Sequence, residues 1–105
     1  MTLLYLDIDG RLPATMHERL TRTLRLWRWP VEAIRYDRTK RGWHVIIAVR
    51  KRLCALTMVA AQAILGSDPK REAFNLIRVR QLRVSGRRAH PWNVLYSHHH
   101  RGVIL

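Results

Sequence analysis

Acidic residues are scarce in this chain of 105 residues, which has seven Asp and Glu against twenty Lys and Arg. The resulting formal net charge of +13 makes a polyanion the expected partner. Nucleic acid, with DNA favoured over RNA, is expected ahead of an acidic membrane surface, because no amphipathic basic helix stands apart from the fold.

Cysteine and long apolar runs are also lacking. The single Cys54 excludes a disulfide framework and fits a reducing compartment. No apolar run reaches the roughly eighteen residues of a membrane span, and no signal peptide precedes Leu3. We therefore expect a soluble, cytoplasmic protein with no membrane partner. A hydrophobic content of 48% indicates a globular chain of one domain.

Apolar periodicity and turn residues define the expected elements. They are a strand at 3–10, a helix at 13–27, strands at 31–39 and 43–49, a helix at 53–65 and a strand at 74–82. This βαββαβ order is the ferredoxin-like or RRM-like plan, an α+β fold with a four-stranded antiparallel sheet and two helices on one face. In the second helix the expected core stripe is Leu56, Ala60, Ala63 and Ile64.

The predicted domain covers residues 1–84, and residues 85–105 form a basic, His-rich extension. Within the extension, 92–96 could add an edge strand. The three histidines at 98–100 are adjacent and lack a spaced fourth ligand, so they favour a solvated or phosphate-facing tail over a zinc site.

The first strand ends in two aspartates. Asp7 and Asp9 are two residues apart, so they share one side of the strand, while Leu4, Leu6 and Ile8 point to the other side. Adjacent carboxylates repel each other unless a cation lies between them. One interpretation is therefore a site for Mg²⁺ or Mn²⁺, since Mg²⁺ is usually held by one or two carboxylates plus substrate phosphates. The alternative is that both aspartates pair with arginines and that Asp9-Gly10 is an ordinary turn.

The predicted topology places the outward residues of the first and third strands side by side on the open face of the sheet. Asp7, Asp9 and His44 should converge there as the candidate catalytic residues. Further site residues are expected around them: Tyr5, Lys40, Arg41, Asp68, Arg71, Arg78 and Arg80. Carboxylates for a metal and basic groups for phosphates are the components of a nucleotide or nucleic-acid phosphate site.

Three short motifs in this order, LDID, RGWH and SDPKREAFNLIRV, resemble those of the archaeo-eukaryotic primase superfamily, the primase-polymerases, whose catalytic subdomain is RRM-like. The resemblance implies that Asp7 and Asp9 bind metal, that His44 contacts the nucleotide and that Asp68 is a third metal ligand. It also places Lys40 and Arg41 near the triphosphate. Family polymerases carry a further α/β unit, for which 105 residues leave no space. A minimal enzyme, a fragment working with a partner subunit and a relic that binds without catalysis all stay open.

Two functions follow. The first is a small primase-polymerase-like protein that handles nucleoside triphosphates on a nucleic-acid template with a divalent metal. The alternative is a non-catalytic RRM-like protein, in which Tyr5 and Trp92 stack on bases while arginines follow the phosphate backbone. Those arginines are Arg78, Arg80, Arg87 and Arg88. A basic structural protein is a third class, and metal dependence separates the first two.

Overall fold

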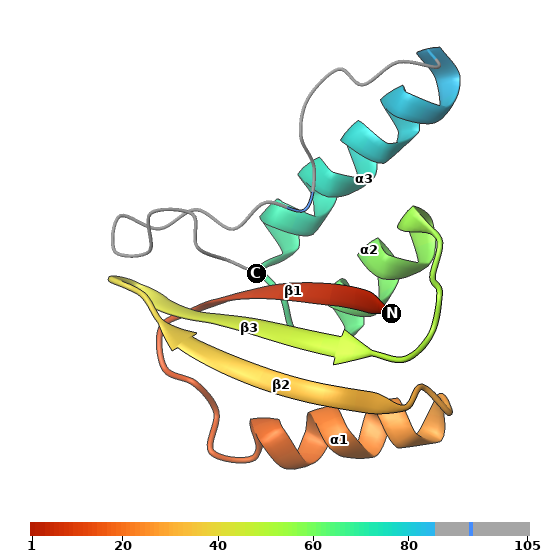
Figure 1. The fold of residues 1–105 in the computed structure, drawn as a ribbon. Helices are drawn as coiled ribbons and strands as arrows, with labels where there is room; N and C mark the ends of the chain where they lie inside the picture. The colour runs from red at the N-terminus through yellow and green to blue at the C-terminus, as the bar shows by residue number, and fades with distance from the viewer. Residues whose placement is uncertain (86–92, 94–105) are drawn as a thin grey trace.

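The computed structural model describes residues 1–85 and Asn93. Arg87, Arg88, Trp92 and the histidines at 98–100 lie outside the described residues, as does the expected edge strand apart from Asn93. The described part is an α+β fold (Figure 1). Its elements are β1 (Thr2–Asp9), α1 (Met16–Leu26), β2 (Val31–Arg38), β3 (Gly42–Val49), α2 (Ala55–Ile64) and α3 (Pro69–Ser85).

The three described strands form one antiparallel sheet in the order β1-β3-β2 (Figure 1). The turn between β2 and β3 closes through two hydrogen bonds, from Thr39 N to the Gly42 carbonyl at 2.8 Å and from Gly42 N to Thr39 Oγ1 at 3.0 Å. Gly42 is required here, because a Cβ at this position would lie 1.9 Å from the carbonyl oxygen of Ile8 on β1. The predicted hairpin is therefore confirmed.

The core lies on one face of this sheet. Alternation puts Leu4, Leu6 and Ile8 of β1 on that face, where all three are buried. Both the first and the second helix bury residues in the same cluster. Its remaining members are Met16, Leu20, Leu24, Val45, Ile47, Val49, Ala61 and Leu65. The face that carries Asp7 and His44 is opposite this core. The expectation that this face is open is wrong at β3, because His44 and Ile46 are both buried there.

The predicted core stripe of α2 is wrong. Ile64 is 68% exposed and Leu56 is 36% exposed, whereas Val59, Ala61 and Gln62 are buried. The buried face of α2 therefore differs from the predicted one, because the polar side chain of Gln62 is buried where the prediction considered only apolar residues.

The predicted strand at 74–82 is also wrong, because these residues belong to α3. Asp68 precedes the helix and its Oδ2 accepts a hydrogen bond from Arg71 N at 3.3 Å, which is the geometry of an N-terminal cap. Glu72, Asn75 and Val79 are buried at helical spacing. A fourth strand is therefore not present among the described residues. Within that part of the chain, no helix is long and apolar enough to cross a membrane.

Candidate functional site

Asp7 and His44 face each other across two neighbouring strands. They are partners in the β1–β3 register, and His44 Nε2 lies 3.8 Å from Asp7 Oδ1. The His44 side chain is 3% exposed and that of Asp7 is 33% exposed. The structure therefore brings these two predicted residues together, with the carboxylate at the surface and the imidazole beneath it.

The carboxylate of Asp7 lies in an acidic environment. Burial raises its pKa above the ordinary value, the charge of Asp9 raises it further, and Asp68 and Glu72 add to the effect. Arg71 opposes the shift by lowering the pKa. Burial and repulsion from the neighbouring carboxylates therefore destabilise the ionised form of Asp7, and a bound cation would relieve that repulsion.

The donor set for a metal ion is smaller than expected. Among the described residues, no three His, Cys, Asp or Glu side chains form a group that could hold a metal ion. The carboxylate of Asp68, the expected third ligand, instead caps α3. Asp7 and Asp9 alone fit the simpler requirement of Mg²⁺ for one or two carboxylates completed by substrate phosphates.

The outer edge of β1 is closed at Asp7. Ser67 Oγ accepts a hydrogen bond from Asp7 N at 3.0 Å, and Asp68 N donates to the carbonyl of Asp7 at 2.7 Å. These are the backbone groups that a fourth strand would use. The segment before α3 therefore fixes Asp7 in place through its main chain and leaves the carboxylate to face outward.

Tyr5 is held in the same way two residues earlier. Its N–H donates to Gln62 Oε1 at 3.0 Å, and its carbonyl accepts from Arg71 Nη1 at 2.9 Å. The phenol lies on the face of Asp7 and is partly buried, which raises its pKa. Its predicted stacking on a base stays a prediction.

Arg71, a predicted phosphate-binding residue, lies within a polar network. Its guanidinium pairs with Glu72 and donates to Asn93 Oδ1 at 2.9 Å. Glu72 Oε1 also accepts from Gln62 Nε2 at 2.8 Å and from Asn75 Nδ2 at 3.0 Å. These contacts give Arg71 a positioning role at β1, and phosphate binding by this residue stays a prediction.

The other predicted basic residues lie on helical or turn positions. Arg78 lies over the Phe74 ring, with its Cζ 5.9 Å from the centroid, and Arg80 is exposed. Both belong to α3 and not to a strand, so their predicted place on the sheet face is wrong. Lys40 and Arg41 are exposed in the β2–β3 turn, as expected.

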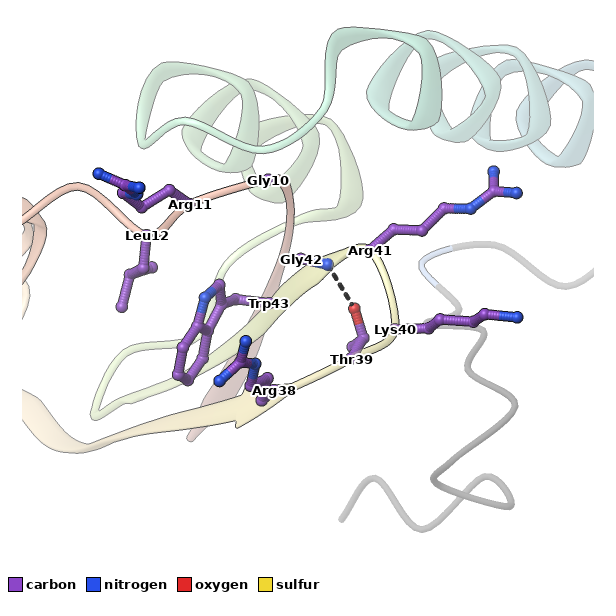
Figure 2. Close-up of a pocket in the computed structure, with 9 residues that line it drawn as sticks. All are labelled: Gly10, Arg11, Leu12, Arg38, Thr39, Lys40, Arg41, Gly42 and Trp43. Carbon is purple, nitrogen blue, oxygen red and sulfur yellow. Dashed lines mark hydrogen bonds between the residues drawn. The ribbon is translucent and has the colours of Figure 1, made fainter.

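A basic pocket of about 460 Å³ lies at this turn, and sequence reasoning missed most of it (Figure 2). The loop after β1 meets the hairpin there, held by a hydrogen bond from Gly10 N to the Arg41 carbonyl at 2.7 Å. Four cationic side chains, one indole, one leucine and the adjoining turn residues surround the pocket. The lining residues are Gly10, Arg11, Leu12, Arg38, Thr39, Lys40, Arg41, Gly42 and Trp43.

The aromatic wall of this basic pocket lies on the core face of the sheet. Side chains alternate along β3, so Trp43 points to the face opposite His44. The Arg38 guanidinium lies 6.0 Å from the centroid of the Trp43 ring, while Lys40 and Arg41 extend away from that ring (Figure 2). The signal that could have located the pocket is the recurrence of basic residues around Gly10 and Gly42, because the register pairs Gly42 with Asp9, the residue before Gly10.

The arrangement separates a cationic pocket from a pair of carboxylates. The basic pocket offers positive charge beside an aromatic surface, which suits phosphate and a nucleobase. The Asp7–Asp9 pair on the other face offers carboxylates to a metal. Comparison with protein-family models, with curated proteins and with solved structures found no match to this chain.

Proposed function

We propose that this protein binds nucleic acid through phosphate contacts centred on the basic pocket at the β2–β3 turn. The observation that carries the proposal is the basic pocket itself, which Arg11, Arg38, Lys40 and Arg41 line together with Trp43. With a net charge of +13, each phosphate contact releases condensed counterions, and this release drives the binding of basic proteins to DNA.

The proposal includes a ferredoxin-like arrangement of the first five elements. The β1-α1-β2-β3-α2 order, with both helices contributing to one core cluster, supports it. In this arrangement α3 takes the place of the fourth strand, and the side chains of Gln62 and Ser67 supply β1 with hydrogen bonds that the strand would have made.

Two adjacent Lys-Arg pairs allow a matched test of the pocket. Lys40 and Arg41 line it, whereas Lys51 and Arg52 are exposed at the other end of β3 and do not. Replacing either pair with glutamine removes the same charge. The change at 40 and 41 should weaken DNA binding across sequences and reduce the slope of log affinity against log salt by about one for each lost phosphate contact.

The measurement is fluorescence anisotropy of a labelled oligonucleotide at several salt concentrations. The change at 51 and 52 should leave the slope close to that of the wild type. Equal effects of the two pairs would show that overall charge, and not the pocket, governs binding. Absence of binding by the wild type at low salt would refute the proposal itself.

The second candidate function is metal-dependent nucleotide handling of the primase-polymerase type. The register that sets Asp7 opposite His44, with Asp9 on the same strand face, favours it. Asp7 and Asp9 would hold Mg²⁺ or Mn²⁺, which when bound would neutralise triphosphate charge. His44, whose side chain is 3% exposed beneath Asp7, would position that carboxylate, and a partner subunit would complete the site.

A melting experiment with Mn²⁺ tests this candidate. Bound metal should raise the wild-type melting temperature by mass action. Asp7→Ala and Asp9→Ala should lose that shift yet melt no lower without metal, because each removes repulsion within the pair. Glu18→Ala is the control, since Glu18 pairs with Arg22 at 3.1 Å on the exposed face of α1, away from the Asp7–His44 face. A wild type that Mn²⁺ does not stabilise would end this candidate.

A further inference from the structure

A second pocket lies at the opposite end of β2. Its volume is about 460 Å³, and residues 28–31 form it together with the last turns of α1. Arg28 has a φ of 61°, a left-handed conformation that reverses the chain after the helix, and Trp29 N donates to the Leu24 carbonyl at 2.9 Å. The lining residues are Thr21, Arg25, Arg28, Trp29, Pro30 and Val31. We call this the Trp29 pocket.

The two pockets share a composition. Each combines a half-buried tryptophan with at least two arginines. Both rings pack against the core cluster, and Trp29 is further held by an edge-on contact with Trp27 at a centroid distance of 4.8 Å. A ring anchored in this way keeps a fixed orientation, so a base that stacks on it does not have to immobilise it first.

β2 connects the two pockets. It runs from Val31 at the Trp29 pocket to Arg38 at the basic pocket, which is about 23 Å at the usual rise of a strand. Among the described strands it is an edge of the sheet (Figure 1). The acidic residues of β2 do not present free negative charge to a polyanion, since Glu32 pairs with Arg50 and Asp37 pairs with Arg35.

From this placement we infer that a single-stranded nucleic acid lies along β2, with one base stacked on Trp29 and another on Trp43. The inference rests on the proposed function and adds the form of the ligand and its path. A duplex does not fit, because its base faces are stacked on one another and are not open to an indole. Arg25 and Arg28 at one end, and Arg11 and Arg38 at the other, would contact the phosphates.

Trp29→Leu and Trp43→Leu remove the stacking surface but keep an apolar side chain for the core. Each should weaken binding of a long oligothymidylate by about tenfold, the effect of losing one stacked base. The salt slope should not change, because no charge is removed. Phe74→Leu is the matched control: Arg78 lies 5.9 Å from the Phe74 ring, yet Phe74 lines neither pocket. It should bind as the wild type does.

The wild type alone provides a second test, should a variant fail to fold. Its affinity for oligothymidylates should rise steeply once a strand is long enough to reach both tryptophans, at roughly four to six nucleotides. A length-independent affinity per phosphate, equal affinity for duplex and single strand, or a loss with only one of the two leucine variants would overturn the path. If the glutamine changes at 40 and 41 still weaken binding in that case, the proposed function stands without it.

Discussion

Replacing Gln62 with leucine is expected to destabilise the protein although the volume of the side chain hardly changes. Gln62 is 0% exposed and joins two parts of the molecule. Its Oε1 accepts from Tyr5 N at 3.0 Å, and its Nε2 donates to Glu72 Oε1 at 2.8 Å. Leucine can replace neither hydrogen bond, so the β1 amide and the buried carboxylate each lose a partner.

The magnitude follows from the groups left behind. An unsatisfied buried amide costs about 1–3 kcal/mol, and the loss at Glu72 is smaller because Arg71 and Asn75 still contact it, so we expect a decrease of about 2–4 kcal/mol in the free energy of unfolding. That is a large fraction of the roughly 5–15 kcal/mol that stabilises a typical domain.

Urea denaturation followed by circular dichroism measures this decrease. The midpoint should fall by about 1 M or more at an unchanged slope. Arg80→Leu is the control, since it introduces the same leucine at an exposed position of α3 and should change stability by less than about 0.5 kcal/mol. A Gln62→Leu variant as stable as the wild type would refute the view that this side chain fixes β1.

Two further substitutions test the β1–β3 end of the sheet. Asp7→Asn should stabilise the protein at neutral pH. Burial and Asp9 raise the pKa of Asp7 in the folded state. The stability that the protonated Asp7 side chain contributes is therefore present at low pH and is lost as the pH rises through that raised pKa. The gain in the free energy of unfolding should vanish below about pH 4, where Asp7 is protonated in both the folded and the unfolded state. Urea unfolding curves measured across pH test this, and a gain that stays constant with pH would contradict it. Gly42→Ala should destabilise by more than Gly10→Ala in the same urea assay. A Cβ at 42 meets the backbone of Ile8, whereas at Gly10 it meets open space and adds only the strain of a φ of +80°, about 1–2 kcal/mol. Equal losses would argue against the close approach of the strands.

The β1–β3 pairing was predictable from the sequence because it depends on local patterns. Leu4, Leu6 and Ile8 alternate with polar residues, and a short basic turn sets the register of the hairpin. From these alone Asp7 and His44 were expected to converge, and the register confirms that they are neighbours.

Helix α3 was missed because its inner face is polar. Glu72 and Asn75 are buried through hydrogen bonds, so an apolar stripe was absent and the alternating apolar residues after Phe74 were interpreted as a strand. The stronger signal was Asp68-Pro69, an N-cap residue followed by proline at the first helical position. Gln62 misled the assignment of α2 for the same reason, since its burial depends on partners distant in the chain.

The basic pocket could not be derived from periodicity. It forms where Gly10 meets Arg41, and the contact depends on the whole β1–β3 register and not on either segment alone. The basic turn itself was expected to bind phosphate. Its neighbours Arg11, Arg38 and Trp43 required the three-dimensional fold.

The closure of β1 at Tyr5 and Asp7 also bears on self-association. An edge strand with unpaired N–H and C=O groups is a template for another chain, and strand addition of this kind leads to domain swapping and fibril growth. At these two residues the four outward backbone groups already have partners within the molecule. Resistance to strand addition at this edge therefore resides in side-chain and backbone groups of the segment from Gln62 to Arg71, about sixty positions further along the chain.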